Sequence, residues 1–218
     1  LPERCAFWLR HVLQYRCPPA KTLELGCSHG GLVYLMRLAG FDAAGLELSP
    51  WVTDFARREF GVPMFCGPAE RQGFASGQFD MLLMMDVIEH LFSPLEAMRR
   101  YAEYLADDAT IVLQTPRYDP AVSYEALAAA DGPFLAQLKG AEHLYLFSEA
   151  SLRQLLVQAG FGYTESKKAI FSQYDQFVFA SRIPLRRHSS EAQTTILAEL
   201  DRQPSILLQT AMEGEKRS

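Results

Sequence analysis

The stretch Thr22-Leu23-Glu24-Leu25-Gly26-Cys27-Ser28-His29-Gly30-Gly31 decides the fold class of this chain. Its apolar start is typical of a buried strand, and the small residues that follow predict a tight turn leading into a helix. Gly26 and Gly30 allow a positive φ and let a ligand approach the bare backbone, while the helix amino terminus offers unpaired N–H groups. The pattern therefore predicts the first strand–turn–helix unit of a parallel sheet, with a ligand site at the turn.

Around this unit, short apolar runs alternate with longer amphipathic ones from Lys21 to about Pro116. This alternation indicates repeated strand–helix units whose parallel strands are covered on both faces. The predicted strands are Lys21–Leu25, Ala43–Leu48, Val62–Cys66, Phe79–Met85 and Ala109–Gln114, and the predicted helices are Gly31–Leu38, Pro50–Phe60, Ser93–Leu105 and Ser148–Ala159. Two later strands, Tyr163–Ile170 and Asp175–Ser181, would close the sheet as an antiparallel hairpin. We therefore expect a doubly wound, mostly parallel, seven-stranded, Rossmann-like α/β sheet.

Further segments surround the predicted sheet. The amphipathic stretch Pro2–Tyr15 predicts a leading helix within residues 1–19. Residues 20–182 would form the main domain, with a helical cover inserted at about 117–147. Residues 183–218 are predicted to be a helical tail or linker. Its apolar positions would dock on their own domain or contact a neighbouring domain or a second copy of the chain.

Composition and charge exclude several classes of protein. The 218 residues, 49% hydrophobic and 22% charged, are typical of one globular domain. A net charge of -5 argues against nucleic acid as a partner. The most apolar run, Met81–Ile88, is far shorter than the ~20 residues of a membrane helix, so we expect no membrane span. Four scattered cysteines favour a cytoplasmic location, and the start at Leu1 leads us to expect a segment of a longer protein.

Two glutamates restrict the class of ligand that the glycine turn can bind. Glu47 ends the second predicted strand about 20 residues after Gly26, where a carboxylate can accept hydrogen bonds from both hydroxyls of a ribose. Glu24 places a second carboxylate where it would repel a pyrophosphate, and Ser28 replaces the middle glycine of a dinucleotide motif. A cationic adenosine compound fits better, and S-adenosylmethionine has both an ammonium and a sulfonium group. The competing interpretation is that Glu24 caps a neighbouring N–H and Glu47 is a solvated strand end.

Later motifs strengthen this interpretation by their order. They are Gly67-Pro68-Ala69-Glu70, Gln78-Phe79-Asp80, Asp86-Val87-Ile88-Glu89-His90-Leu91, and His143–Phe147 with the helix after it. With them, residues 20–182 resemble the class I S-adenosylmethionine-dependent methyltransferases, in particular the small-molecule branch that includes the ubiquinone-biosynthesis type. Tyr174–Ser181 also resembles the closing hairpin of methyltransferase modules in bacterial glycan-assembly proteins.

The resemblance implies a cofactor-binding role for each matching position. These positions are Glu24 for the ammonium, Gly26, Cys27, Ser28 and Gly30 in the turn, Glu47 for the ribose, Leu48 and Ala69 for the adenine, Glu70 in place of the acidic residue that the family often has where Pro68 stands, and Asp86 where the methionine half meets the acceptor.

Histidines are the natural general bases if the methyl acceptor is a hydroxyl. His90, after the fourth predicted strand, and His143, on the cover, are the candidate catalytic residues, although either could simply bond a carbonyl. Glu89 could join them as a metal ligand. On a helix, however, the adjacent side chains of Glu89 and His90 point in different directions, so we predict no metal site.

The sequence therefore favours a methyltransferase that acts on a hydroxyl oxygen of a small metabolite or glycan. Two other functions stay open: an oxidoreductase that uses a nicotinamide dinucleotide, and a noncatalytic scaffold module that binds an adenosine cofactor.

Overall fold

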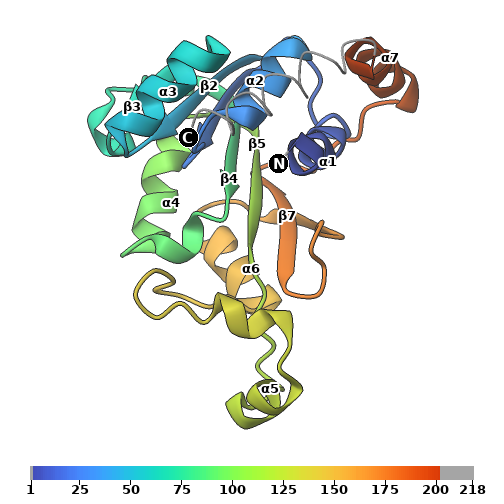
Figure 1. Cartoon of the computed structure of the whole chain (residues 1–218). Coiled ribbons are helices and arrows are strands. Elements are labelled where there is room, and N and C mark those ends of the chain that lie inside the picture. Colours follow the sequence, from blue (N-terminus) through green and yellow to red (C-terminus); the bar gives the residue numbers. More distant parts are fainter. Residues whose placement is uncertain (1, 202–218) are drawn as a thin grey trace.

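The computed structural model describes residues 2–201 and contains one seven-stranded sheet (Figure 1). Its strands are β1 (Lys21–Leu25), β2 (Asp42–Glu47), β3 (Met64–Cys66), β4 (Phe79–Met85), β5 (Leu105–Pro116), β6 (Tyr163–Lys167) and β7 (Asp175–Ser181). They lie in the order β3-β2-β1-β4-β5-β7-β6. β1 to β5 pair in parallel, whereas β7 is antiparallel to both β5 and β6. The predicted mostly parallel sheet with an antiparallel closing hairpin is therefore confirmed.

Helices cover both faces of the sheet. One face carries α1 (Pro2–Val12), α2 (Gly31–Leu38), α3 (Pro50–Phe60) and α7 (Ser190–Asp201), and the other carries α4 (Pro94–Glu103) and α6 (Glu149–Gln158). Side chains alternate along β4, so that Met81 and Leu83 enter the first core while Leu82 and Met84 enter the second. Within residues 2–201, no helix has both the length and the apolar character needed to cross a membrane.

The two terminal helices pack on the body of the domain. Trp8 and Leu9 of α1 are buried in the first core, and Leu200 of α7 is buried there as well. The backbone N–H of His188 donates to the carbonyl of Gln14 at 2.8 Å, which connects the segment before α7 to the segment after α1. The described part of the tail therefore docks on its own domain, while the rest of the predicted tail, residues 202–218, lies outside the described residues.

The predicted cover contains α5 (Tyr124–Ala130) and a short 3-10 helix, Pro133–Gln137. None of the α5 residues is buried, and Figure 1 shows this helix standing away from the sheet. The ends of the cover are fixed where the N–H of Tyr118 donates to the carbonyl of Phe147 at 2.9 Å. The N–H groups of Leu144 and Tyr145 also donate to the carbonyl of Glu89, so the cover is joined to the domain near both of its ends, whereas α5 contributes no buried residue.

Several element boundaries differ from those predicted, among them the end of β6, which is Lys167 instead of Ile170. β3 begins at Met64 instead of Val62, because Pro63 has no N–H to donate to a neighbouring strand. β5 is longer than predicted and starts at Leu105, where it pairs with Phe79 before an irregularity in the register. The leading helix ends at Val12 rather than Tyr15.

Gly45 of β2 lies against the glycine turn, and we expect Gly45→Ala to destabilise the domain. A Cβ at this position would collide with the Cys27 sulfur and lie 2.8 Å from the Met64 sulfur. The overpacking should lower the free energy of unfolding by about 1–3 kcal/mol, measured by urea denaturation. Gly162→Ala is the control, because a Cβ there meets no atom of the described residues within 4 Å. Equal stability of the two variants would contradict the predicted clash.

Candidate active site

The turn after β1 is built from residues in the left-handed region of the backbone. Gly26, Ser28 and Gly30 have φ angles of 63°, 49° and 74°. A Cβ on Gly26 would lie 2.7 Å from a methyl group of Val87, so both the backbone conformation and the available space favour glycine there. Gly30 caps α2, and its N–H donates to the Cys27 carbonyl at 2.9 Å. The turn is therefore a narrow backbone surface next to a helix amino terminus.

Glu47, the last residue of β2, connects this turn to the next one. Its carboxylate accepts hydrogen bonds from three backbone N–H groups, those of Ser28 at 3.1 Å, Leu48 at 2.8 Å and Ser49 at 3.1 Å. Each carboxylate oxygen can accept further hydrogen bonds. The side chain therefore holds two loops together at the point where the sequence predicts a ribose.

Glu24 is buried, with 6% of its surface exposed, and faces the amino terminus of α2. Burial raises the pKa of its carboxyl group to about 8, and a hydrogen bond from the backbone N–H of Val33 offsets this only in part. Within residues 2–201, its Oε2 atom has no hydrogen-bond partner. Burying a carboxylate without a partner is costly, so this position favours a cation beside it.

A cleft of about 730 Å³ opens at the ends of β1 and β2 and extends along α4. Four of the predicted cofactor-binding residues line it: Gly26, Leu48, Ala69 and Glu70. Its other walls are mostly apolar, as a flat heteroaromatic group requires. Glu70 lies close enough to Tyr101 that its charge adds to burial in raising the pKa of that hydroxyl.

Asp86 follows β4 and has a positive φ of 57°. One carboxylate oxygen accepts a hydrogen bond from the Gln114 side chain at 3.1 Å, and the other pairs with Arg4 of α1 at 2.9 Å. The sequence predicted Asp86 at the end of the fourth strand, and the structure places it directly after β4. The sequence did not reveal Arg4 or Gln114, because neither residue is near Asp86 in the chain and no spacing links them.

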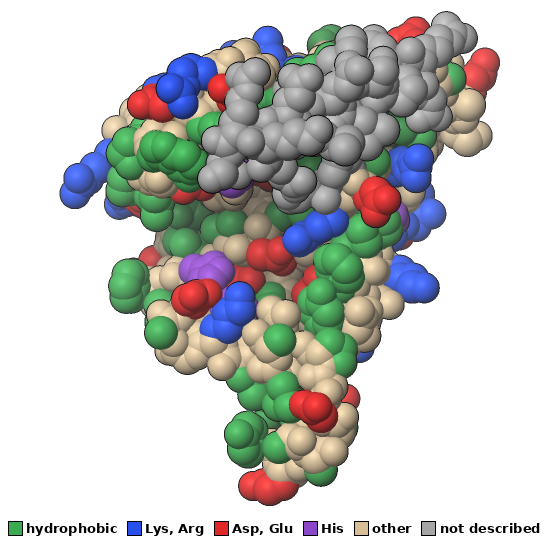
Figure 2. Space-filling model, viewed as in Figure 1, with side chains coloured by type: hydrophobic (Ala, Val, Ile, Leu, Met, Phe, Trp, Pro, Cys, Tyr) green, Lys and Arg blue, Asp and Glu red, His purple; other side chains and the backbone are tan. Residues whose placement is uncertain are grey.

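Asp175, the first residue of β7, was also missed by the sequence reasoning. It is buried, and burial together with the charge of Asp86 raises the pKa of its carboxyl group to about 7. Figure 2 shows acidic and histidine side chains around a hollow between the sheet and the cover. The apolar positions of β7 would predict the same strand whether its first residue were Asp175 or an uncharged residue. The sequence around Asp175 therefore gave no signal that its carboxyl group lies near Asp86.

His90 and His143 lie side by side, with ring centroids 4.8 Å apart. The Nδ1 atom of His90 lies 2.7 Å from the carbonyl of Glu142, and that of His143 lies 2.8 Å from the carbonyl of Gln137. Because a carbonyl only accepts, each Nδ1 carries the hydrogen and each Nε2 keeps its lone pair when the ring is neutral. Burial lowers the pKa of His143, which favours this neutral form.

Glu89 joins the two histidines, which corrects the prediction that its side chain diverges from that of His90. Ile88–His90 is a 3-10 turn rather than an α-helix, and the ligand atoms of Glu89, His90 and His143 lie within 4.8 Å of one another. Glu89 is 1% exposed, and burial raises the pKa of its carboxyl group to about 7. Its Oε2 accepts from Thr115 at 3.0 Å, while Oε1 has no partner among the described residues. One carboxylate and two imidazoles suit a divalent transition metal.

The comparisons with known proteins identify the family. Residues 1–166 match the family described as "Methyltransferase domain", and the chain belongs to this family. It is 30% identical over 142 residues to the ubiquinone biosynthesis O-methyltransferase of Xanthomonas campestris pv. campestris, a match that covers 62% of this chain and 59% of that protein. The chain thus spans less than two thirds of the length of this relative.

Solved structures confirm the fold of the family. The putative methyltransferase in complex with the Trm112 activator of Haloferax volcanii has a TM-score of 0.64 and 14% identity, covering 86% of this chain and 92% of that one. Magnesium protoporphyrin IX methyltransferase from Synechocystis, with bound SAH, has a TM-score of 0.61 and 16% identity, covering 82% and 80%. Membership of this family supports the predicted cofactor, S-adenosylmethionine.

The Glu89–His90–His143 cluster predicts that a divalent cation such as Zn²⁺ binds here. His143→Ala should weaken Zn²⁺ binding at least tenfold, measured by calorimetry on protein without a histidine tag, because one of three ligands is lost. The control is His188→Ala, which removes an exposed histidine outside the cluster. Equal zinc affinity of the wild type and His143→Ala would rule out this cluster as the binding site.

Proposed function

We propose that this protein is an S-adenosylmethionine-dependent O-methyltransferase that acts on a hydroxyl group of a small metabolite or glycan. The observation that carries the proposal is the pair of histidines near the end of β4, whose Nδ1 atoms lie beside carbonyls, together with the glycine turn and its glutamates on the neighbouring strands β1 and β2. A relative named as an O-methyltransferase supports the same choice of acceptor atom.

In this proposal the cofactor lies along the carboxyl edge of the sheet. The adenine would occupy the cleft between Leu48 and Ala69, where 66% of the Leu48 surface is exposed and available for contact. The ribose hydroxyls would donate to Glu47. The methionine part would lie over the glycine turn with its ammonium directed to Glu24, a buried carboxyl group whose Oε2 has no hydrogen-bond partner among the described residues.

The reaction is a displacement at carbon. The acceptor oxygen attacks the methyl carbon, the C–O bond forms, and the C–S bond breaks with its electron pair moving to sulfur, which leaves S-adenosylhomocysteine. The hydroxyl proton passes to Nε2 of His143. Positioning and exclusion of water supply much of the rate, because the sulfonium is already a good leaving group.

In an alternative arrangement Glu89, His90 and His143 would hold a metal ion, and Nε2 of His143 would then be a ligand instead of the proton acceptor. When bound, a divalent cation would lower the pKa of a coordinated acceptor hydroxyl and so assist its deprotonation. The unpartnered Oε1 of Glu89 supports this arrangement. Hydroxyl chemistry is favoured with or without the ion, since both arrangements promote loss of a proton from oxygen.

Calorimetry with S-adenosylmethionine and with NAD tests which cofactor the protein binds. The pH dependence of the affinity for S-adenosylmethionine tests the role of Glu24. In the free protein the Glu24 carboxyl group is neutral below about pH 8, and the ammonium of the ligand favours its ionised form. Affinity for S-adenosylmethionine should therefore rise from pH 6 to pH 8, by up to about tenfold per pH unit. Tight binding of NAD without binding of S-adenosylmethionine would instead favour an oxidoreductase.

The matched variants are Glu24→Gln and Glu89→Gln. Glu24→Gln should remove the rise in affinity with pH, because the amide does not titrate. Glu89→Gln should keep it, although the pKa of Glu89 is raised into a similar range. The same slope in wild type and Glu24→Gln would exclude Glu24 as the group that binds the ammonium.

His143→Gln should lower kcat by about 10²–10⁴-fold while leaving the Kd for S-adenosylmethionine nearly unchanged. The assay follows transfer of a radiolabelled methyl group to a panel of phenols and sugars that carry free hydroxyls. Equal loss of turnover and cofactor binding would show that His143 is structural. Cofactor binding by the wild type without turnover on any hydroxyl compound would favour a scaffold module.

A further inference from the structure

A chain of hydrogen bonds, buried at Trp8 and Gln114 and partly buried at Asp86, connects α1 to the end of β4. The indole N–H of Trp8 donates to Oε1 of Gln114 at 2.9 Å, and Nε2 of Gln114 donates to Oδ1 of Asp86 at 3.1 Å. The other oxygen of Asp86 accepts from Arg4 at 2.9 Å. The chain thus joins the first helix, strand β5 and the residue after β4, three segments that are distant in sequence.

The chemistry of these groups fixes the direction of the chain. The indole N–H of Trp8 only donates, and the Asp86 oxygen that faces Gln114 accepts. The amide of Gln114 has both functions, so its oxygen must face Trp8 and its nitrogen must face Asp86. Gln114 has no exposed surface and Trp8 is buried, so water does not compete for the hydrogen bond between them.

Asp86 is a residue that needs such support. Its φ of 57° is unfavourable for a residue with a side chain, and its N–H donates to the backbone carbonyl of Gln114 at 2.9 Å. Gln114 therefore holds both the backbone and the carboxylate of Asp86. The Asp86 side chain is still 39% exposed, so it remains accessible to a ligand.

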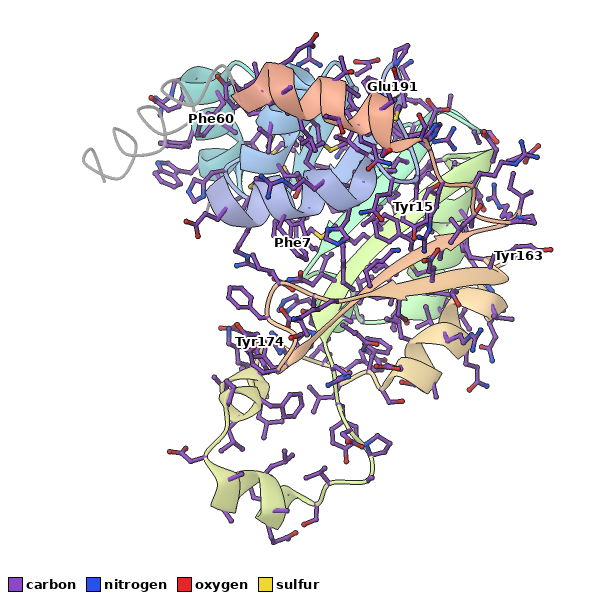
Figure 3. The ribbon with its side chains drawn as sticks, turned by 90° about the vertical axis from the view of Figure 1, so that its right-hand side faces the viewer. Phe7, Tyr15, Phe60, Tyr163, Tyr174 and Glu191 are labelled. Atoms are coloured by element: carbon purple, nitrogen blue, oxygen red, sulfur yellow. The ribbon has the colours of Figure 1, made fainter. Side chains whose placement is uncertain are left out.

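Arg4 and Trp8 lie one turn apart on α1, and the Arg4 guanidinium lies 5.0 Å from the centre of the Trp8 ring. Trp8 thus supports the Asp86 carboxylate in two ways: it donates to Gln114, and its ring contacts Arg4, the residue that pairs with Asp86. Figure 3 shows α1 lying along the sheet, with the labelled Phe7 and Tyr15 on the side of the closing hairpin. One rigid helix therefore fixes both contacts to the carboxylate.

We propose that Trp8 and Gln114 are positioning residues that set the orientation of the Asp86 carboxylate toward the methyl donor, so that α1 is part of the active site. This inference rests on the proposed function and on the role that the family resemblance implies for Asp86, at the point where the methionine half of the cofactor meets the acceptor. The carboxylate would act on the positive charge of the sulfonium, which S-adenosylmethionine has and S-adenosylhomocysteine lacks.

The test is a double-mutant cycle of Trp8→Phe with Asp86→Gly, in which glycine accepts the positive φ and removes the carboxylate. Kd values for both nucleosides are measured by calorimetry, and folding is checked by thermal unfolding. Trp8→Phe should weaken binding of S-adenosylmethionine about three- to tenfold and binding of S-adenosylhomocysteine less. In the Asp86→Gly background, Trp8→Phe should have no further effect.

Two further variants keep the test decisive. Gln114→Met, of similar size but without hydrogen bonds, should reproduce the selective loss. Trp51→Phe is the control, because the chain has 2 tryptophans and Trp51 is 63% exposed on α3; its affinities should match the wild type. Equal weakening of both nucleosides, or a full Trp8→Phe effect without Asp86, would overturn the inference while leaving the proposed function intact. A wild type that binds neither nucleoside would overturn both.

Discussion

The parallel register of the central strands is the constraint on which the site depends. Leu25 of β1 pairs with Leu46 on one side and with Met84 on the other, so β1, β2 and β4 end at the same edge of the sheet. Gly26, Glu47 and Asp86 are therefore brought together although long stretches of chain separate them. A single slip in register would turn the side chains of a strand to the opposite face and separate these groups.

Much of this arrangement is predictable from sequence because its signals are local. Apolar periodicity in the sequence indicates the strands, and Gly26 indicates the turn. The structure explains the glycine signal, because the backbone at Gly26 has a positive φ and leaves no room for a side chain. The contacts of Arg4 and Gln114 with Asp86 were not predictable, because they depend on how α1 docks over the sheet. The convergence of Glu89 and His90 depends on whether one turn is α or 3-10, a choice that local sequence does not settle.

The site buries three carboxyl groups in places that disfavour their charged form. Burial raises the pKa of Glu24 from 4.5 to about 8, and those of Glu89 and Asp175 to about 7. These carboxyl groups stay neutral in the folded protein at pH values where the unfolded chain has already ionised them. They therefore favour folding at low pH and lose this contribution as the pH rises through their folded pKa values. A bound cation reverses that trend, so ligand binding and stability are linked through the same side chains.

The exposed helix of the cover has a consequence of a different kind. Because none of the α5 residues is buried, exchanging them changes few contacts of the core, and the cover is fixed to the sheet mainly at its ends. Substitutions in α5 should therefore change the free energy of unfolding of the domain only a little. The fold of the sheet and the sequence of α5 are therefore nearly independent of each other, because α5 contributes no buried residue to either core.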